Sequence, residues 1–242
     1  MDLELSGRRA LVTGSSSGLG EAIAHTLAAE GAAVVVHGRD ERRTAAVAEA
    51  IGGARYVLGD LATEAGAERV AAQAGDVDIL VNNAGRYDRR QWSEASPERW
   101  VESYETNVVS AVRLIRRMVP PMRDRGWGRV VQIGGGLASQ PDAMAPHYEA
   151  ALAARHNLAV SLARELKGSG VTSNVVSPGA IDTEGIRPFG AELDAAAAET
   201  DVGRLGRPEE IAAAVAYLCG TGADYVCGAT IRVDGGRILS AF

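Results

Sequence analysis

Short apolar runs alternate with segments of helical length along this chain, and that alternation limits its fold more than any other feature. The runs that read as strands are RRALVTG, AAVVVHG, ARYVLGD, VDILVNNAG, GRVVQIGGG, VTSNVVSPG and ATIRVDGG. The clearest helical segments are Gly18–Gly31, Glu41–Ile51, Pro97–Arg125, Pro146–Lys167 and Pro208–Cys219. Because strands that alternate with helices form parallel sheets, the pattern predicts an α/β fold. We expect a doubly wound sheet of seven parallel strands with helices on both faces.

The chain reads as one domain over residues 1–242, since neither a linker nor a repeat interrupts the pattern. A chain of 242 residues buries enough surface for one large core. The alanine-rich stretch AELDAAAAET, residues 191–200, reads as a short helix in an excursion over about 184–200. We expect this excursion to act as a lid over the substrate.

Charge and composition argue against several classes of function. The net charge of −6 gives no reason to expect binding to nucleic acid or to an anionic membrane. No apolar run is long enough to span a membrane, and the start of the chain lacks a signal-peptide pattern, so we expect a cytoplasmic protein. Cys219 and Cys227 have apolar neighbours and are expected to be buried free thiols. Two cysteines and four scattered histidines show no metal-ligand spacing, so no metal is expected.

The stretch TGSSSGLG, residues 13–20, joins the first predicted strand to the first predicted helix. Glycines there permit a tight turn, close approach of the backbone to a pyrophosphate and close packing of helix on strand. The start of the helix then offers free N–H groups to the anion. The sequence therefore predicts a dinucleotide site of the Rossmann type.

The second predicted strand ends VVVHGRD, and this end distinguishes the two dinucleotides. Arg39 stands where the 2′-phosphate of NADPH would lie, and a guanidinium matches that dianion. Asp40 follows it and keeps NADH possible, because an acid binds the ribose hydroxyls of NADH. We expect NADPH, with NADH as the alternative.

Several motifs in order along the whole chain resemble those of the short-chain dehydrogenase/reductase family of single-domain type. They are TGSSSGLG, LGDL around Asp60, NNAG at 82–85, Asn107 in YETNVVS, SPGAIDT, GRPEEIA and the final VDGG. The resemblance implies an NAD(P)H-dependent oxidoreductase. The cofactor residues that it implies are Gly14, Ser15, Ser17, Gly18, Leu19, Gly20, Arg39, Asp60, Leu61, Asn83, Ala84, Gly85, Pro178, Gly179, Ile181 and Thr183. It also implies that Tyr148 and Asn107 are catalytic, with Asn107 holding a water that relays protons.

The chain departs from the family pattern at two catalytic positions. Members pair the tyrosine with a lysine four residues later and a serine thirteen residues earlier. Here these positions are Leu152 and Gly135. Without a neighbouring cation, nothing in the sequence lowers the pKa of a phenol from about 10, so we expect Tyr148 to stay protonated. It can then donate a proton but is a poor base for alcohol oxidation.

Three interpretations of this departure stay open. We favour an electrophile activated before hydride arrives, such as an iminium ion, a cyclic imine or a hemiaminal, because no negative charge then develops. Asp142, Glu149 and Asp182 would favour such a cation. The second is an ordinary ketone or aldehyde, with Ser139, Gln132, His147, Arg155 or His156 compensating. The third is a sensor or scaffold that binds NADPH without turnover.

The predicted substrate site lies in loops beyond the carboxyl ends of the strands. Its candidate residues are Gly135, Tyr87, Trp92, Met144, His147 and Phe189. They suggest a bulky, partly aromatic small molecule, such as a secondary metabolite. The resemblance implies a homo-oligomer, with a tetramer expected first and a dimer next.

Overall fold

In the computed structural model, which describes residues 2–187 and 190–239, seven parallel strands form one sheet in the order β3-β2-β1-β4-β5-β6-β7. The strands are β1 Arg9–Val12, β2 Ala33–Gly38, β3 Arg55–Leu58, β4 Ile79–Asn82, β5 Gly128–Ile133, β6 Val171–Pro178 and β7 Thr230–Val233. From β1 the sheet extends in both directions, through β2 and β3 on one side and through β4 to β7 on the other. This makes the sheet doubly wound and confirms the predicted fold class. In open sheets of this kind, ligands bind at the carboxyl edge beside the point of reversal.

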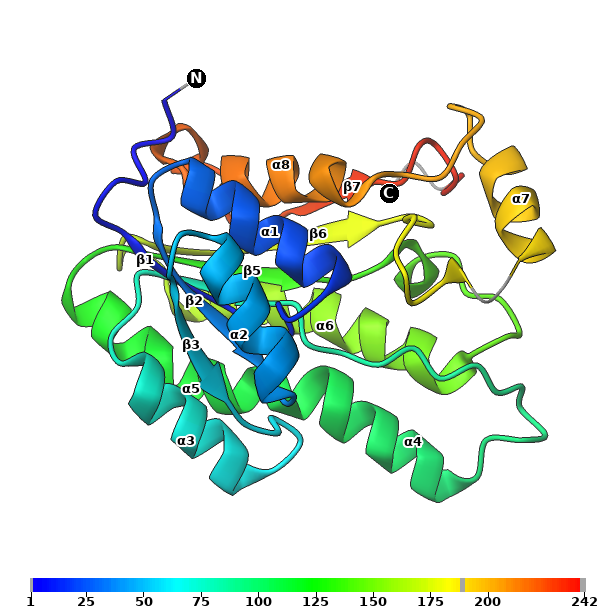
Figure 1. Cartoon of the computed structure of the whole chain (residues 1–242). Coiled ribbons are helices and arrows are strands. Elements are labelled where there is room, and N and C mark those ends of the chain that lie inside the picture. Colours follow the sequence, from blue (N-terminus) through cyan, green and yellow to red (C-terminus); the bar gives the residue numbers. More distant parts are fainter. Residues whose placement is uncertain (1, 188–189, 240–242) are drawn as a thin grey trace.

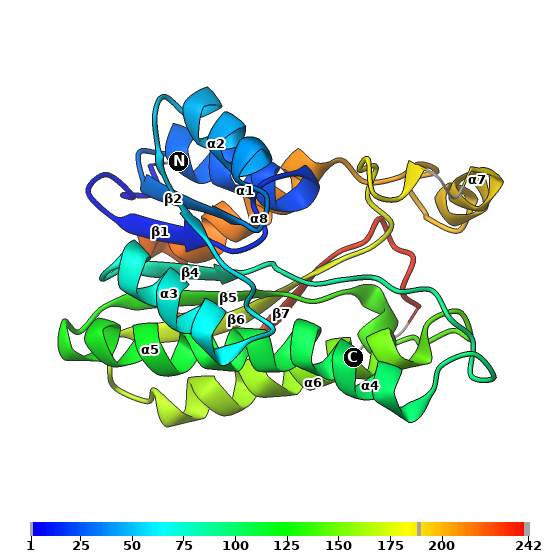
Figure 2. The ribbon, with the colours of Figure 1, turned by 60° about the horizontal axis from the view of Figure 1, so that its bottom comes forward.

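Helices cover both faces of the sheet (Figures 1 and 2). One face carries α1 Gly18–Ala29, α2 Glu41–Ala50 and α8 Pro208–Cys219, and the other carries α3 Glu64–Ala74, α5 Ser110–Asp124 and α6 Pro146–Glu165. Successive residues of a strand point to opposite faces of the sheet, so they belong to two different cores. Val131 and Ile133 of β5 pack with α1 and α8, whereas Val130 packs with α5. Strands buried on both faces explain why the sequence shows unbroken apolar runs there.

The predicted helix Pro97–Arg125 is interrupted in the structure. It consists of α4 Pro97–Tyr104, a π-helical turn over Glu105–Val109 and α5. Asn107 is buried in the middle of that turn. A π-helical turn inside a longer helix is often found at a functional site.

The predicted lid contains one helix, α7 Ala191–Ala198. It lies beyond the carboxyl ends of the strands (Figure 1). An ion pair connects α7 to the loop after β4, because Arg89 Nη1 donates to Glu192 Oε2.

The two cysteines differ, which corrects one expectation. Cys219 is buried, and burial raises the pKa of its thiol to about 12. Cys227 is exposed and not buried, because it lies in the loop before β7. Within the described part of the chain, no helix has the length and apolar content needed to cross a membrane.

Candidate active site and cofactor cleft

The turn after β1 and the first turn of α1 each require a glycine. Gly14 has a φ of +63°, and a Cβ there would lie 3.0 Å from Ala84 Cα. A Cβ on Gly20 would lie 2.3 Å from the Gly14 carbonyl oxygen. Asn83 Nδ2 fixes the turn by donating to the Thr13 and Gly14 carbonyls at 2.9 and 3.1 Å. The glycines therefore permit the contacts between turn, helix and neighbouring strand that the sequence predicted.

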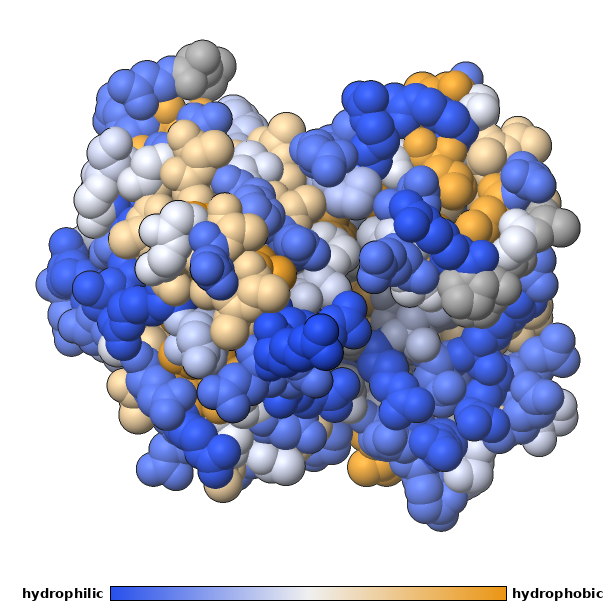
Figure 3. All heavy atoms as spheres, viewed as in Figure 1, coloured by the Kyte–Doolittle hydropathy of each residue, from blue (hydrophilic) through white to orange (hydrophobic). Residues whose placement is uncertain are grey.

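The start of α1 has the form of an anion site. Ser17 precedes the helix with extended backbone and makes no side-chain capping bond, so the first N–H groups remain available. Thr183 lies over this end, since its Cγ2 would be 3.8 Å from a Cβ on Gly18. SPGAIDT thus folds back onto the phosphate turn, and Gly18, Leu19 and Thr183 would hold a pyrophosphate there. Figure 3 shows the surface hollowed between the part that carries α1 and α2 and the part that carries α7.

Arg39 is exposed at the end of β2 and forms no ion pair within residues 2–187 and 190–239. Asp40 has a structural role, because its Oδ1 caps α2 by accepting the Arg43 N–H at 2.9 Å. The guanidinium is therefore the group left to meet a ribose substituent. Asp60 Oδ1 accepts the Ala62 N–H at 3.0 Å, and the Leu61 side chain lies in the core, so only the Leu61 backbone can reach a cofactor.

His37 connects two predicted cofactor segments, and no sequence motif marks it as functional. Its Nδ1 accepts the Gly14 N–H at 2.9 Å, and its Nε2 lies 3.0 Å from the Gly59 carbonyl. These bonds require the tautomer protonated on Nε2. Burial lowers the pKa of His37 to about 4, so the ring is neutral at physiological pH.

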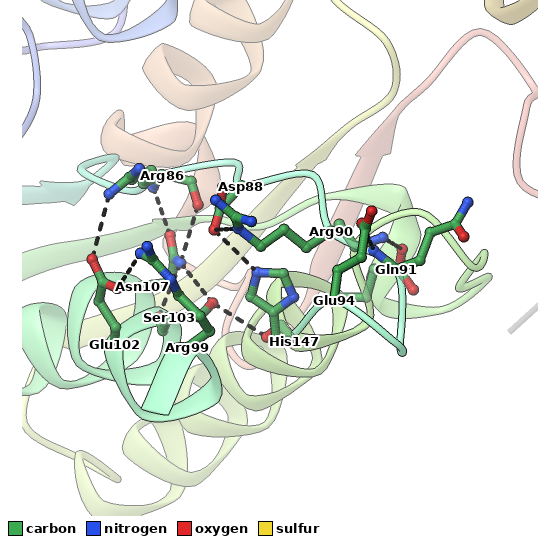
Figure 4. Close-up of polar contacts among 12 residues, drawn as sticks. Arg86, Asp88, Arg90, Gln91, Glu94, Arg99, Glu102, Ser103, Asn107 and His147 are labelled. Carbon is green, nitrogen blue, oxygen red and sulfur yellow. Dashed lines mark hydrogen bonds and ion pairs between the residues drawn. The ribbon is translucent and has the colours of Figure 1, made fainter. Parts of the chain in front are cut away.

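Asn107 fixes the chain that follows NNAG (Figure 4). Its Oδ1 accepts the Arg86 N–H at 2.8 Å, and its Nδ2 donates to the Arg86 and Ser103 carbonyls. Beside it lies a cavity of about 10 Å³, lined in part by Ser103, Asp88 and His147. That volume matches one water molecule. The relay role of Asn107 stays a prediction.

His147 lines this cavity and has different neighbours from Tyr148. It is buried, with its ring against Trp100 at 6.1 Å and its Nε2 3.8 Å from Asp88 Oδ2. Trp92, which is 68 % exposed, packs against Trp100 with tilted rings and 5.1 Å between the ring centroids. These predicted substrate residues therefore form an aromatic cluster beside the loop and not a wall around the phenol.

Tyr148 lies in the first turn of α6, directly after Pro146 and His147. Its ring meets Tyr87 edge-on at 5.2 Å between centroids, and the role of Tyr87 in the substrate site stays a prediction. Burial raises the pKa of Tyr148, and the charge of Arg155 acts in the opposite direction. The phenol is therefore protonated at neutral pH. Phe189, another predicted substrate residue, lies outside the described residues.

Gly135 and Leu152, at the two departing positions, contact each other. A Cβ added to Gly135 would lie 2.9 Å from Leu152 Cδ1. Leu152 is 3 % exposed. The two positions at which the family has a serine and a lysine are thus in apolar contact with each other.

Arg155 corrects the expectation that Tyr148 has no neighbouring cation. Arg155 is buried, and its Nη1 and Nη2 donate to the Ile133 and Ala84 carbonyls at 2.7 and 2.5 Å.

Of the other proposed substitutes, Ser139 is exposed, whereas the buried Gln132 side chain has no hydrogen-bond partner in the described chain. His156 packs against Gly134, where a Cβ would lie 2.2 Å from its Nε2.

The three acids proposed to attract a cation are not equivalent. Asp142 Oδ1 accepts the Met144 N–H at 2.6 Å, and Asp182 forms an exposed ion pair with Arg187 at 3.3 Å. Burial, with the nearby Asp142 carboxyl, raises the pKa of Glu149 to about 7. Glu149 therefore carries only part of a negative charge at neutral pH.

Comparison with known proteins identifies the family. The family model described as enoyl-(acyl carrier protein) reductase matches residues 14–237. The 3-oxoacyl-[acyl-carrier-protein] reductase FabG of Escherichia coli is 38 % identical over 98 % of this chain and 100 % of its own, and the uncharacterized oxidoreductase YvaG of Bacillus subtilis is 36 % identical over 100 % of both. L-Sorbose reductase from Gluconobacter frateurii, solved with NADPH and L-sorbose, superposes with a TM-score of 0.93 at 35 % identity, covering 99 % of this chain and 100 % of that one. The chain belongs to the short-chain dehydrogenase/reductase family, and the predicted oxidoreductase class is confirmed.

Proposed function

We propose that this protein is an NADPH-dependent reductase that delivers hydride to the carbonyl carbon of a small molecule, with Tyr148 as the proton donor. The observation that carries the proposal is a neutral phenol at the cofactor cleft. Its hydroxyl has no hydrogen-bond partner among the described residues, and the shifted pKa keeps its proton in place. A carbonyl that accepts hydride becomes an alkoxide and needs such a proton, whereas an iminium ion does not. The same neutral phenol is a poor base, so reduction is the favoured direction.

NADPH fits this cleft better than NADH does. The cofactor supplies hydride when bound. Arg39 is a cation at the end of β2 that no acid of the described chain pairs, while Asp40 is committed to capping α2. Relatives with carbonyl substrates in their names, such as L-sorbose reductase, support the same chemistry.

A second candidate function is reduction of a preactivated C=N bond, which the sequence alone favours. The contact between Gly135 and Leu152 supports it, because that contact leaves Tyr148 as the one donor of the three usual positions. A hemiaminal or cyclic imine needs no second donor. The partly protonated Glu149 offers little negative charge for such a cation, so we place it second.

The experiment compares NADPH consumption on matched ketones and cyclic imines, with Tyr148→Phe as the variant. We expect ketone turnover, and we expect the variant to lose about 10²- to 10⁴-fold in kcat. NADPH affinity, titrated in both proteins, should be unchanged. Turnover confined to imines that survives in Tyr148→Phe would contradict the carbonyl proposal. Tight NADPH binding without turnover of either class would favour a sensor.

We also propose that the protein works as a homo-oligomer in the cytoplasm. The outward residues Ala150, Ala153, Asn157 and Ser161 form a line of small side chains along α6. Such a line permits close approach of a second helix, as a dimer or tetramer would require. The identity of the substrate as a bulky secondary metabolite stays a prediction.

A further inference from the structure

Arg155 and Tyr148 lie on the same face of α6, seven residues apart. Seven residues make nearly two full turns, so the two side chains leave the helix in almost the same direction. The charge of Arg155 acts on the phenol, because it lowers the pKa of Tyr148 against the effect of burial. The lysine of the family pattern would approach the same region from position 152, one turn from Tyr148.

Two backbone carbonyls hold the guanidinium at the carboxyl edge of the sheet. Ile133 ends β5, and Ala84 belongs to NNAG after β4. The Ala84 segment lies beside the phosphate turn, since the Ala84 N–H also donates to Thr13 Oγ1 at 2.9 Å. The positive charge is therefore fixed at the carboxyl edge of the sheet, next to the segment that contacts the phosphate turn.

Arg155 is 3 % exposed, and no carboxylate of the described chain pairs with it. A buried charge without a counterion is costly. Burial lowers the pKa of Arg155 to about 10, which still leaves it charged at neutral pH. Two other titratable groups face the pair: Tyr87 lies against Tyr148, and His156 follows Arg155 on the helix with its own pKa lowered by burial and by Arg155. Neither is an anion at neutral pH.

We propose that Arg155 supplies, from two turns along α6, the positive charge that Leu152 does not, and that it thereby stabilises the phenolate left when Tyr148 gives up its proton. The inference rests on the proposed carbonyl reductase function. In that reaction the carbonyl carbon accepts hydride with its electron pair, and the C=O π pair moves to oxygen. The oxygen then takes the proton of Tyr148, and solvent restores that proton afterwards. The Arg155 guanidinium binds two backbone carbonyls and is proposed to act through Tyr148, so it is a positioning residue.

The first test needs no substrate. The protein is produced with 3-fluorotyrosine, whose phenol is more acidic, and the Tyr148 signal is assigned in ¹⁹F NMR by its loss in Tyr148→Phe. Arg155→Met removes the charge and keeps a long apolar stem. We expect the Tyr148 signal to titrate at a pH higher by about one unit or more in Arg155→Met. An unchanged titration would overturn the inference, even if the protein reduces carbonyls.

The second test moves the charge back to the family position. With a ketone substrate, Arg155→Met should lower kcat at least about tenfold and shift its alkaline limb upward. The double variant Leu152→Lys/Arg155→Met should recover part of the lost kcat and should return the alkaline limb part of the way to its original pH. The introduced lysine would again place a cation one turn from Tyr148. If Arg155→Met is unstable, Arg155→Lys serves as the second variant, because it keeps the positive charge. Its Tyr148 signal should titrate at a pH closer to that of the original protein than the signal of Arg155→Met does. If the titration shifts but no carbonyl is reduced, the charge relationship stands and the proposed function fails.

Discussion

Gly135 and Leu152 fit together as a pair. A Cβ on Gly135 would approach Leu152 Cδ1 to 2.9 Å, and Leu152 is almost fully buried. Gly135 has a φ of −179°, an extended conformation that any residue adopts, so the contact and not the backbone is what favours glycine here. The two departures from the family pattern are therefore one structural change: the leucine occupies the space that a serine side chain would need.

Introducing serine at this position should destabilise the protein through that contact. Gly135→Ser should lower the free energy of unfolding by about 1 kcal/mol, since the end of the Leu152 side chain can shift in part. In a Leu152→Ala background the same change should cost less, giving a coupling energy of about 1 kcal/mol. Urea unfolding of the four proteins measures the cycle. Gly185→Ser is the control, because a Cβ there meets no atom closer than 3.9 Å. Equal costs of Gly135→Ser in both backgrounds would contradict the pairing.

The rate of reduction should hold at high pH. Because burial raises the pKa of Tyr148 above its ordinary value of 10, the phenol keeps its proton throughout the neutral and mildly alkaline range. We expect kcat for reduction to be flat from neutral pH to about 10 and to fall only beyond it, while alcohol oxidation rises over the same range. Stopped assays in both directions, with circular dichroism at each pH as the folding control, check this. A loss of reduction with a midpoint near pH 8 would show that Tyr148 is more acidic than the structure indicates.

Local sequence patterns predicted the elements whose signals are contained within them. The segment Pro208–Cys219 matches α8 residue for residue, because proline at its first position and Gly220 after its end mark both boundaries. The helix Pro97–Arg125 was predicted without its π-helical turn, since nothing in the period of its apolar residues reveals one extra residue per turn.

The site was predictable where one motif builds it, and not where distant segments meet. The place of Arg155 on the helix marks it as a candidate substitute for the lysine. Its role depends on the carbonyls of Ile133 and Ala84, which lie 22 and 71 residues away. The bridge made by His37 likewise joins residues 23 and 22 positions distant in sequence. Such contacts follow from the strand order, which brings these segments to one edge of the sheet.

Arg39 should determine the preference between the two cofactors. A charge-assisted bond to a 2′-phosphate is worth about 1.5–3 kcal/mol, so Arg39→Ala should raise the Kd for NADPH roughly 10- to 100-fold. The Kd for NADH, which lacks that phosphate, should change by less than about threefold. Fluorescence titration of both cofactors checks the ratio, with the exposed Arg42→Ala on α2 as the matched control. Equal weakening of both cofactors would show that Arg39 does not bind the 2′-phosphate.

His37 should make stability depend on pH in the acid range. Its pKa is about 4 in the folded protein, against 6.5 for an ordinary histidine. Between these values the unfolded chain binds a proton that the folded protein does not, so stability falls as pH decreases from 6.5 to 4, by about 3 kcal/mol at most. Asparagine at this position can still accept the Gly14 N–H but cannot reach the Gly59 carbonyl. His37→Asn should therefore be less stable than the original protein at pH 7 and should lose this part of the acid dependence.

The measurement is the difference in the free energy of unfolding between the protein and His37→Asn at pH 7, 6, 5 and 4. Taking the difference matters because the raised pKa of Glu149 acts with the opposite sign: the folded protein holds that proton more tightly, so its contribution decreases as pH rises from 4.5 to about 7. Glu149 is present in both proteins, and its contribution cancels. His25→Asn on α1 removes an imidazole without disturbing the bridge and should leave the slope unchanged. A difference that stays constant from pH 7 to 4 would show that His37 is not held neutral between Gly14 and Gly59.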